Sequence, residues 1–176
     1  MTQHSEDLMF GSSTSARGAE FAEFARSAST SLTRTAYLLC GNRETAADLV
    51  QETLVRTYVA WPRVRHEEAR AYARRILVNL DIDRRRRRSA VPTEYVDRPV
   101  PNTAESASDN RDQVVRMLAT LPETQRRVIV LRYFDDLTEA AVAEYLGISI
   151  GTVKSACSRG LAALRKSYDP ATEGGQ

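Results

Sequence analysis

The chain has 176 residues, a formal net charge of +2 and 42% hydrophobic residues. This length and composition are sufficient for one or two small domains with modest cores. Its two cysteines, Cys40 and Cys157, fit neither a metal-ligand spacing nor a disulfide framework, which excludes a disulfide-stabilised secreted scaffold and favours a cytoplasmic protein. We expect neither a signal peptide nor membrane insertion, because no apolar run is long enough to span a bilayer.

Helical periodicity begins after a polar stretch at the start of the chain. Residues 1–17 are mostly small and polar, and we expect them to form a disordered tail. From Ala19 to Cys40, apolar residues recur at three- and four-residue steps, which predicts an amphipathic helix. Gly41 and Asn42 follow it, and both tolerate the left-handed conformation that closes a helix.

Two further helices complete the predicted first domain. The second runs from about Glu44 to Trp61 and stops before Pro62. Its predicted apolar face consists of Ala47, Val50, Leu54 and Tyr58. The third begins near Glu67 and runs into the five consecutive arginines at 84–88. Its predicted apolar face consists of Tyr72, Ile76 and Leu80 with Ala69 and Ala73 beside them.

The composition changes at Ser89 and divides the chain. Residues 89–110 carry three prolines, several small polar residues and more acidic than basic side chains, which is typical of a linker. Strand signals are scarce on both sides of it. We therefore predict an all-α fold of two small helical domains, 18–88 and 111–168, joined by a flexible linker and followed by a disordered tail at 169–176.

The most informative stretch, residues 138–166, has the pattern of a helix, a tight turn and a second helix. Thr138 is placed to cap the first helix, Gly147 to close it in a left-handed conformation, and Ser149 to cap the second. Ala143 is small enough for the two helices to cross closely. The pattern is typical of a helix-turn-helix that reads DNA, and an ordinary helical hairpin with a solvated face is the alternative.

In a helix-turn-helix, the N-terminal part of the second helix enters the major groove. Free amides in its first turn attract phosphate, and its polar side chains donate to phosphates or base edges. The residues that we expect to contact DNA are Ser149, Gly151, Thr152, Lys154, Ser155 and Arg159.

A basic stretch from Pro62 to Arg88 contains ten arginines and four acidic residues. Clustered cations bind nucleic-acid phosphates by releasing counterions, and consecutive arginines repel one another unless a polyanion is present. Trp61 and Tyr72 lie in or beside this stretch. They either stack on unpaired bases or are ordinary core or rim aromatics.

Asp48, Gln51 and Glu52 share the side of the second helix that lies opposite its apolar face. Acidic and amide groups do not face DNA. This patch therefore either promotes solubility or docks a basic surface of another protein.

No catalytic constellation accompanies these features. The histidines are His4 and His66, the cysteines are isolated, and no glycine-rich phosphate loop is present. We therefore expect no enzymatic activity, no metal and no cofactor.

With these residues in place, the chain resembles a bacterial RNA polymerase sigma factor of the extracytoplasmic-function (ECF) group in the sigma-70 superfamily, and most of all the actinobacterial SigE-like branch. The resemblance covers about residues 18–168. It is carried by the segments 46–58, 71–79 and 121–128, the last of these followed by Gly151-Thr152-Val153-Lys154-Ser155. Several motifs in one order and spacing are far more specific than any single motif.

The resemblance implies a sigma-2 domain followed by a sigma-4 domain. It implies that Asp48, Gln51 and Glu52 bind the clamp helices of the polymerase β′ subunit. This favours a docking role for the acidic and amide patch over a role in solubility. The resemblance also implies that the chain binds the β flap of polymerase. The implied contacts with the −10 element are Trp61, Tyr72, Arg74, Arg75, Asn79, Arg84 and Arg85, and Asn79 helps to hold an everted base. The helix 149–165 would read the −35 element, and the linker would pass through polymerase toward the RNA exit path.

The implied function is that of a sigma factor, which binds core RNA polymerase, directs it to promoters through their −10 and −35 elements and promotes melting. The alternative is a stand-alone helix-turn-helix regulator that does not depend on core polymerase, and the two-domain layout with a flexible linker argues against it. An anti-sigma factor is a further implied partner. Ala156 and Gly160 depart from the family pattern, so we expect a thinner set of −35 contacts.

Overall fold

The computed structural model describes residues 6–90 and 107–167, with side chains described from residue 16 and from residue 110 onward in the two ranges. The predicted tail at 169–176, and most of the predicted linker at 89–110, lie outside the described residues. Within the described ranges every regular element is helical, which confirms the predicted all-α class.

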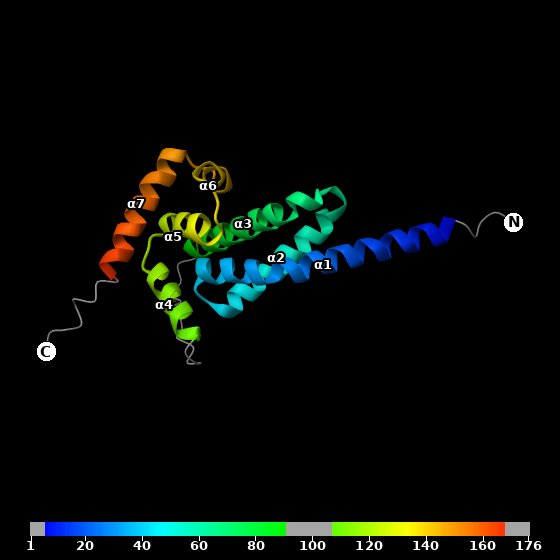
Figure 1. The fold of residues 1–176 in the computed structure, drawn as a ribbon, viewed down its shortest axis with the longest axis horizontal. Helices are drawn as coiled ribbons and strands as arrows, with labels where there is room; N and C mark the ends of the chain where they lie inside the picture. Colours follow the sequence, from blue (N-terminus) through cyan, green and yellow to red (C-terminus); the bar gives the residue numbers. More distant parts are fainter. Residues whose placement is uncertain (1–5, 91–106, 168–176) are drawn as a thin grey trace.

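The first domain is built from three long helices, α1 (Glu6–Cys40), α2 (Arg43–Ala60) and α3 (Ala69–Ala90). Two short 3₁₀ turns, η1 (Trp61–Arg63) and η2 (His66–Glu68), connect α2 to α3. The three helices lie side by side, and the N-terminal part of α1 extends beyond the others (Figure 1). Residues 6–17 were expected to be a disordered tail. They are instead part of α1, because extending a formed helix adds one hydrogen bond per residue and this stretch has no proline.

In the turn between α1 and α2, Gly41 is left-handed as predicted, whereas Asn42 is extended and caps the next helix. Gly41 adopts φ +74°, and its N–H donates to the Tyr37 carbonyl oxygen at 2.8 Å. Asn42 is the N-cap of α2, where its side-chain oxygen accepts from the Thr45 N–H at 2.8 Å. These two residues set the antiparallel packing of α2 on α1.

The buried face of α2 differs from the predicted one. Ala47 and Tyr58 are exposed, whereas Thr53 and Thr57 are fully buried. The Thr53 hydroxyl donates to the Leu49 carbonyl oxygen, and the Thr57 hydroxyl donates to that of Thr53, both at 2.7 Å. Val50 and Leu54 of the predicted face do pack in the core. Threonines whose hydroxyls are satisfied within their own helix pack in a core as apolar groups do, so the apolar pattern alone gave only part of the face.

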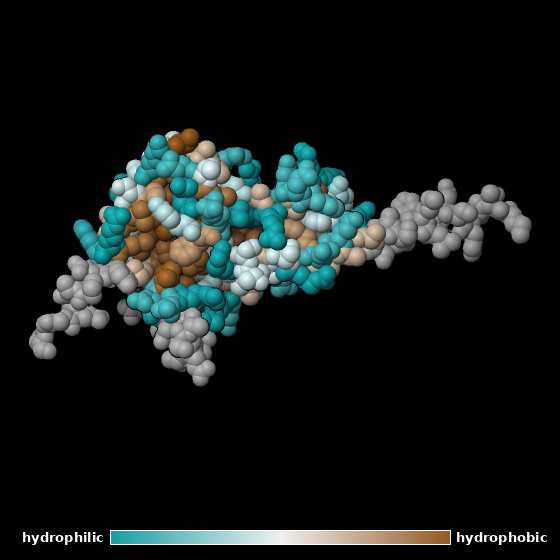
Figure 2. All heavy atoms as spheres, viewed as in Figure 1, coloured by the Kyte–Doolittle hydropathy of each residue, from teal (hydrophilic) through white to brown (hydrophobic). Residues whose placement is uncertain are grey.

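The second domain contains α4 (Ala107–Ala119), α5 (Glu123–Ile129), α6 (Glu139–Leu146) and α7 (Ile150–Ser167). A wider π-type segment, η3 (Val130–Phe134), continues α5 before the chain turns into α6. In Figure 1, α7 stands at the far end of the molecule from the N-terminus, with α4 and α5 between it and the first domain. On the face drawn in Figure 2, hydrophobic residues gather over this end of the molecule.

Two buried clusters hold the helices together. One lies inside the first domain, among α1, α2 and α3, and consists of Ala28, Leu32, Ala36, Ala46, Leu49, Val50, Ala73, Leu77 and Leu80. The other joins both domains. In it Leu38 and Leu39 of α1 and Val78 of α3 pack with second-domain residues that include Val115, Leu118, Val128, Ile129, Leu131, Val142 and Val153. Residues of the two predicted domains therefore share this second core.

Gly147 provides a direct test of the turn between α6 and α7, because it adopts φ +63°. Gly147→Ala should lower the free energy of unfolding by about 1–2 kcal/mol, since a Cβ is disfavoured in the left-handed region. Crowding is not the cause, because no atom lies within 4 Å of the added Cβ. The measurement is urea unfolding followed by circular dichroism.

The matched control is Gly18→Ala, at a position in α1 where the added Cβ also meets nothing within 4 Å. This change should leave stability unchanged or raise it by up to about 1 kcal/mol, because alanine favours the helix. Equal destabilisation by the two substitutions would rule out backbone conformation as the reason for Gly147.

Candidate nucleic-acid interface

The turn between α6 and α7 has the geometry of a helix-turn-helix. Thr138 caps α6 by accepting from the Ala141 N–H at 3.2 Å. At the other end, Gly147 and Ile148 both direct their N–H groups at the Ala143 carbonyl oxygen, the latter at 3.1 Å. Ala143 and Val153 are buried where the two helices meet. The caps and the crossing residues are those predicted from the sequence.

The first turns of α7 present the predicted DNA-contacting face. The Ser149 hydroxyl oxygen accepts from the Thr152 N–H at 3.1 Å and so caps the helix. Val153 and Ala156 face the core, which turns the opposite side of α7 outward. The exposed residues are Ser149, Ile150, Gly151, Thr152, Lys154, Ser155, Ser158 and Arg159. Polar donors at the amino end of an exposed helix are arranged to meet a nucleic-acid groove.

The residues predicted to contact the −10 element do not form one open surface on α3. Tyr72 and Asn79 are exposed and Arg84 is half-buried. Arg74, Arg75 and Arg85 instead form ion pairs with second-domain carboxylates, those of Asp135, Glu144 and Glu123 respectively. The sequence placed these arginines on the correct helix but gave no sign of their partners.

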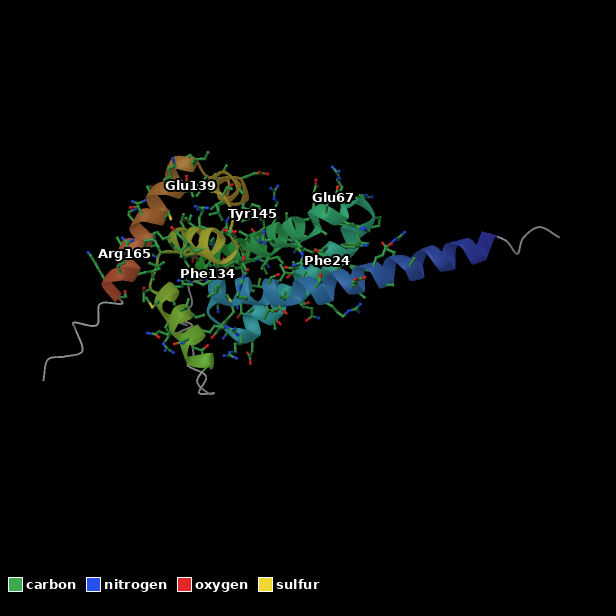
Figure 3. The ribbon with its side chains drawn as sticks, viewed as in Figure 1. Phe24, Glu67, Phe134, Glu139, Tyr145 and Arg165 are labelled. Carbon is green, nitrogen blue, oxygen red and sulfur yellow. The ribbon has the colours of Figure 1, made fainter. Side chains whose placement is uncertain are left out.

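Trp61 lies in an aromatic cluster and is 4% exposed. Its ring centroid lies 5.2 Å from that of Phe21 and 5.0 Å from that of Phe24, and His66 stacks on it at 4.9 Å with an interplanar angle of 21°. Phe24, labelled on α1 in Figure 3, is one member of this cluster. Of the two roles considered from the sequence, the burial of Trp61 favours the core aromatic, because a base would have to displace His66 to reach the indole.

The acidic and amide patch on α2 is exposed as predicted, at Asp48, Gln51 and Glu52. The structure adds two apolar residues to the same side of the helix, Val55 at 56% and Val59 at 76% exposure. The positions 48, 51, 52, 55 and 59 are spaced by three and four residues and so form one stripe, which we call the α2 stripe. Sequence reasoning missed the two valines, although their spacing from Glu52 was available as a signal.

Comparison with known proteins identifies the family of this chain. The sigma-70 region 2 family matches residues 24–91, and the sigma-70 region 4 family matches residues 111–164. The chain is 37% identical to RNA polymerase sigma-E factor of Streptomyces avermitilis over 85% of this chain and 86% of that protein. It is 34% identical to the ECF RNA polymerase sigma factor SigW of Bacillus subtilis over 74% of this chain and 79% of that protein.

The chain belongs to the ECF sigma factors. As a sigma factor, it binds core RNA polymerase and directs it to promoters for transcription initiation, which confirms the function expected from the resemblance. A stand-alone helix-turn-helix regulator is not favoured.

Solved structures share the fold of this sigma factor. The sigma factor RpoE of Bartonella quintana, in complex with the anti-sigma factor NepR, matches with a TM-score of 0.62 and 24% identity over 84% of this chain and 98% of that one. CnrH in complex with the cytosolic domain of CnrY matches with a TM-score of 0.62 and 23% identity over 85% of this chain and 87% of that one. None of the described helices is long and apolar enough to cross a membrane.

Asp135 is an ionisable group of this sigma factor whose pKa is shifted by its position. Its side chain is 2% exposed, its Oδ1 accepts from the Thr35 hydroxyl at 2.6 Å, and Arg74 Nε lies 3.2 Å from its Oδ2. Burial raises the pKa of Asp135, and the Thr35 hydrogen bond and the charges of Arg74 and Arg34 only partly oppose this.

The raised pKa of Asp135 predicts a specific pH dependence of stability. As the pH rises from about 4, the unfolded chain ionises at this residue before the folded one does, so this residue makes the folded state less stable until the pH passes the raised pKa. Asp135→Asn removes that effect and keeps an oxygen that accepts from Thr35. The unfolding free energy of the variant, relative to the wild type, should therefore increase with pH over this window and then level off.

The measurement is urea unfolding of both proteins at several pH values in the acid range. A difference between variant and wild type that stays constant across the range would contradict a raised pKa at Asp135.

Proposed function

We propose that three surfaces of this sigma factor have separate roles in transcription initiation. The α2 stripe docks on the clamp helices of polymerase β′, α3 faces the −10 element, and the first turns of α7 read the −35 element, with the β flap bound by the second domain. In this proposal the sigma-2 domain spans 18–88 and the sigma-4 domain 111–168. The single observation that carries it is the exposure of the α7 reading face and of the α2 stripe on opposite domains of one chain.

The α2 stripe supports docking on a protein rather than on DNA. Its carboxylates and amide suit a basic protein surface, and Val55 and Val59 supply an apolar centre for such an interface. Burying an exposed valine side chain stabilises a complex by roughly 1–2 kcal/mol. Solubility alone does not require two adjacent exposed valines, so the structure favours the docking alternative over the solubility alternative.

At the −10 element, we propose that Asn79 and Tyr72 contact an everted base while the arginines of α3 bind phosphates. Asn79 is exposed and carries both a donor and an acceptor, which suits the edge of an unpaired base. Tyr72 is partly exposed and offers an aromatic face for stacking. Contacts of this kind offset the unstacking cost of a few kcal/mol that melting requires.

We further propose that the chain performs no chemistry of its own and acts in the cytoplasm, where polymerase and promoter DNA meet. Among the described residues, no His, Cys, Asp or Glu side chains are grouped to hold a metal ion. Polymerase supplies the catalytic step. One structural neighbour, RpoE, is bound to the anti-sigma factor NepR, which supports an anti-sigma factor as a partner of this chain.

Loss of the polar part of the α2 stripe should weaken polymerase binding. The double variant Gln51→Ala/Glu52→Ala should raise the Kd for core polymerase by about tenfold, because two polar contacts of the interface are removed. The measurement is fluorescence anisotropy of labelled chain titrated with core enzyme. Glu23→Ala, at an exposed position on α1, is the control and should bind as the wild type does. An unchanged Kd in the double variant would exclude the docking role and, with it, the proposed division of surfaces.

The reading role of α7 is tested by a pair of matched substitutions within one helix. Lys154→Ala and Arg159→Ala should each lower transcription from a promoter selected with the holoenzyme by about fivefold or more, because a DNA contact near the amino end of α7 is lost. Lys166→Ala and Arg165→Ala remove the same charges from the last turn of α7 and should have little effect.

The readout is run-off transcription on the selected promoter and on a copy with a scrambled −35 element. The reading role requires that the defect of the Lys154 and Arg159 variants disappears on the scrambled template. Equal defects on both templates would assign these residues to general phosphate attraction instead.

A further inference from the structure

A small polar cavity lies where the two domains meet. It has a volume of about 90 Å³ and lies between α1, the first turns of α3 and the loop that precedes α6. The polar residues that line it are Ser31, Thr35, Arg70, Arg74 and Asp135. The cavity is several times larger than the roughly 10–15 Å³ that one water molecule needs. It is well below the roughly 300–1,000 Å³ of sites for cofactors and larger ligands, so a ligand here has only a few non-hydrogen atoms.

The loop before α6 brings Asp135 of the second domain to this cavity. The Asp135 N–H donates to the Val130 carbonyl oxygen at 3.1 Å. Arg34 of α1 donates to the carbonyl oxygen of Phe134, which Figure 3 labels where this loop meets α1. These contacts hold the backbone on both sides of the cavity, so the carboxylate of Asp135 has a fixed position among residues of the first domain.

One oxygen of this carboxylate lacks a well-directed donor. Asp135 Oδ1 accepts from the Thr35 hydroxyl at 2.6 Å. Arg74 Nε lies 3.2 Å from Oδ2, but within residues 6–90 and 107–167 no group donates to Oδ2 in hydrogen-bond geometry. The side chain is 2% exposed, so bulk water does not replace the missing donor. A buried carboxylate oxygen in this position is satisfied by a ligand that carries an O–H or N–H group.

The rest of the lining suits the charge and the oxygens of an anion. The guanidinium groups of Arg70 and Arg74 are donors only, and together with Asp135 they give the lining a formal charge of +1. Arg70 is exposed and so lies at the mouth of the cavity, whereas the side chain of Arg74 is only 22% exposed. The Ser31 hydroxyl donates within α1 at 2.9 Å, which leaves its oxygen as an acceptor. One negative charge in the cavity would balance the lining.

We propose that this cavity binds a small monoanionic oxyanion that carries its own O–H group. The anionic oxygens of the ligand accept from Arg70 and Arg74, and its O–H donates to the carboxylate of Asp135. Bicarbonate and dihydrogen phosphate both have this chemistry and this size. Nitrate has the charge and the planar shape of bicarbonate, but it offers no donor to Asp135. The inference is independent of the polymerase and promoter surfaces proposed above.

A ligand in this cavity contacts two helices of the first domain and a loop of the second. The site exists only in the folded chain, because it joins residues such as Thr35 and Asp135 that are 100 positions apart. The ligand therefore stabilises the folded chain by mass action. Burial raises the pKa of Asp135, and a donor from the ligand favours the ionised carboxylate and opposes this shift.

The test is an NMR titration of the isotopically labelled full chain at near-neutral pH and constant ionic strength. Sodium bicarbonate and sodium phosphate are the probes in separate arms, and sodium nitrate is the matched control. The amide shifts of Thr35, Arg74 and Asp135 locate the site and give the Kd. At least one probe should bind with a Kd in about the millimolar range, as a ligand of a few atoms can, and about tenfold or more tightly than nitrate. The arm that responds identifies which oxyanion fits.

Arg70→Gln tests the charge at the mouth of the cavity. It should weaken binding of the responding probe about tenfold, because a charged donor is lost, and it should fold normally because Arg70 is exposed. The matched control is Arg63→Gln, which removes the same charge from an exposed position in η1 outside the lining. This control should bind the probe as the wild type does.

Asp135→Asn tests the selectivity for an O–H group. The asparagine oxygen keeps the hydrogen bond from Thr35, and its amide N–H₂ takes the place of the acceptor that faces the ligand. The preference for the probe over nitrate should therefore disappear in this variant. If Asp135 had only a structural role, the variant would change the affinity for both anions by the same factor and keep the preference.

Two results would overturn the proposal. If neither bicarbonate nor phosphate gives saturable shifts at the cavity, water is its only occupant and the site is refuted. If nitrate binds the wild type as tightly as the probes do, the shifts report general attraction between anions and arginines, and the site is refuted as well. Both results come from the wild-type chain, so they decide the question even if Asp135→Asn does not fold.

Discussion

The ion pair between Asp81 and Arg127 is the constraint on which the arrangement of the two domains depends. Both residues are almost completely buried, and they come from helices that sequence patterns assign to different domains. Desolvation makes such a pair costly unless each charge has further partners, and here Arg85 and Glu123 supply them. An ionic centre of this kind is satisfied in only one register of α5 against α3. It therefore fixes how the second domain sits on the first more tightly than apolar packing alone would.

The position of α5 against α3 determines which functional surfaces are accessible to solvent. With α5 seated on the C-terminal half of α3, α6 reaches the first turns of α3, and Asp135 and Glu144 come to face Arg74 and Arg75. The same placement turns the first turns of α7 toward solvent, whereas the α2 stripe is exposed on the first domain itself. One interface thus determines how much of α3 is accessible and which side of α7 is exposed. The domain core shared by Leu39, Val78 and Val128 supplies the apolar burial that accompanies the ionic contacts.

Local features of this fold were predictable from the sequence because they rest on local physics. The caps at Thr138 and Ser149 and the left-handed Gly147 need only the residue and its neighbours, and the structure confirms each of them. The α2 face was predicted only in part, because a threonine that bonds within its own helix is counted as polar although it packs as an apolar residue. The interface between the two domains was not predicted at all. A pairing between residues 46 positions apart, such as Asp81 with Arg127, leaves no periodic signal in a single sequence.

The near-neutral net charge of the chain has a physical meaning in this light. A basic surface that binds phosphate is a liability when DNA is absent, because its charges repel one another and attract other polyanions. Carboxylates on the second domain neutralise part of that surface inside the same molecule. The pair of Arg75 with Glu144 is exposed and individually weak, whereas Arg74 is paired with the buried carboxylate of Asp135. Phosphate competes well against an exposed pair, whereas the buried pair of Asp81 with Arg127 resists exchange. The stability of the domain interface and the ease with which phosphate displaces its exposed ion pairs therefore depend on different residues, and they can change independently.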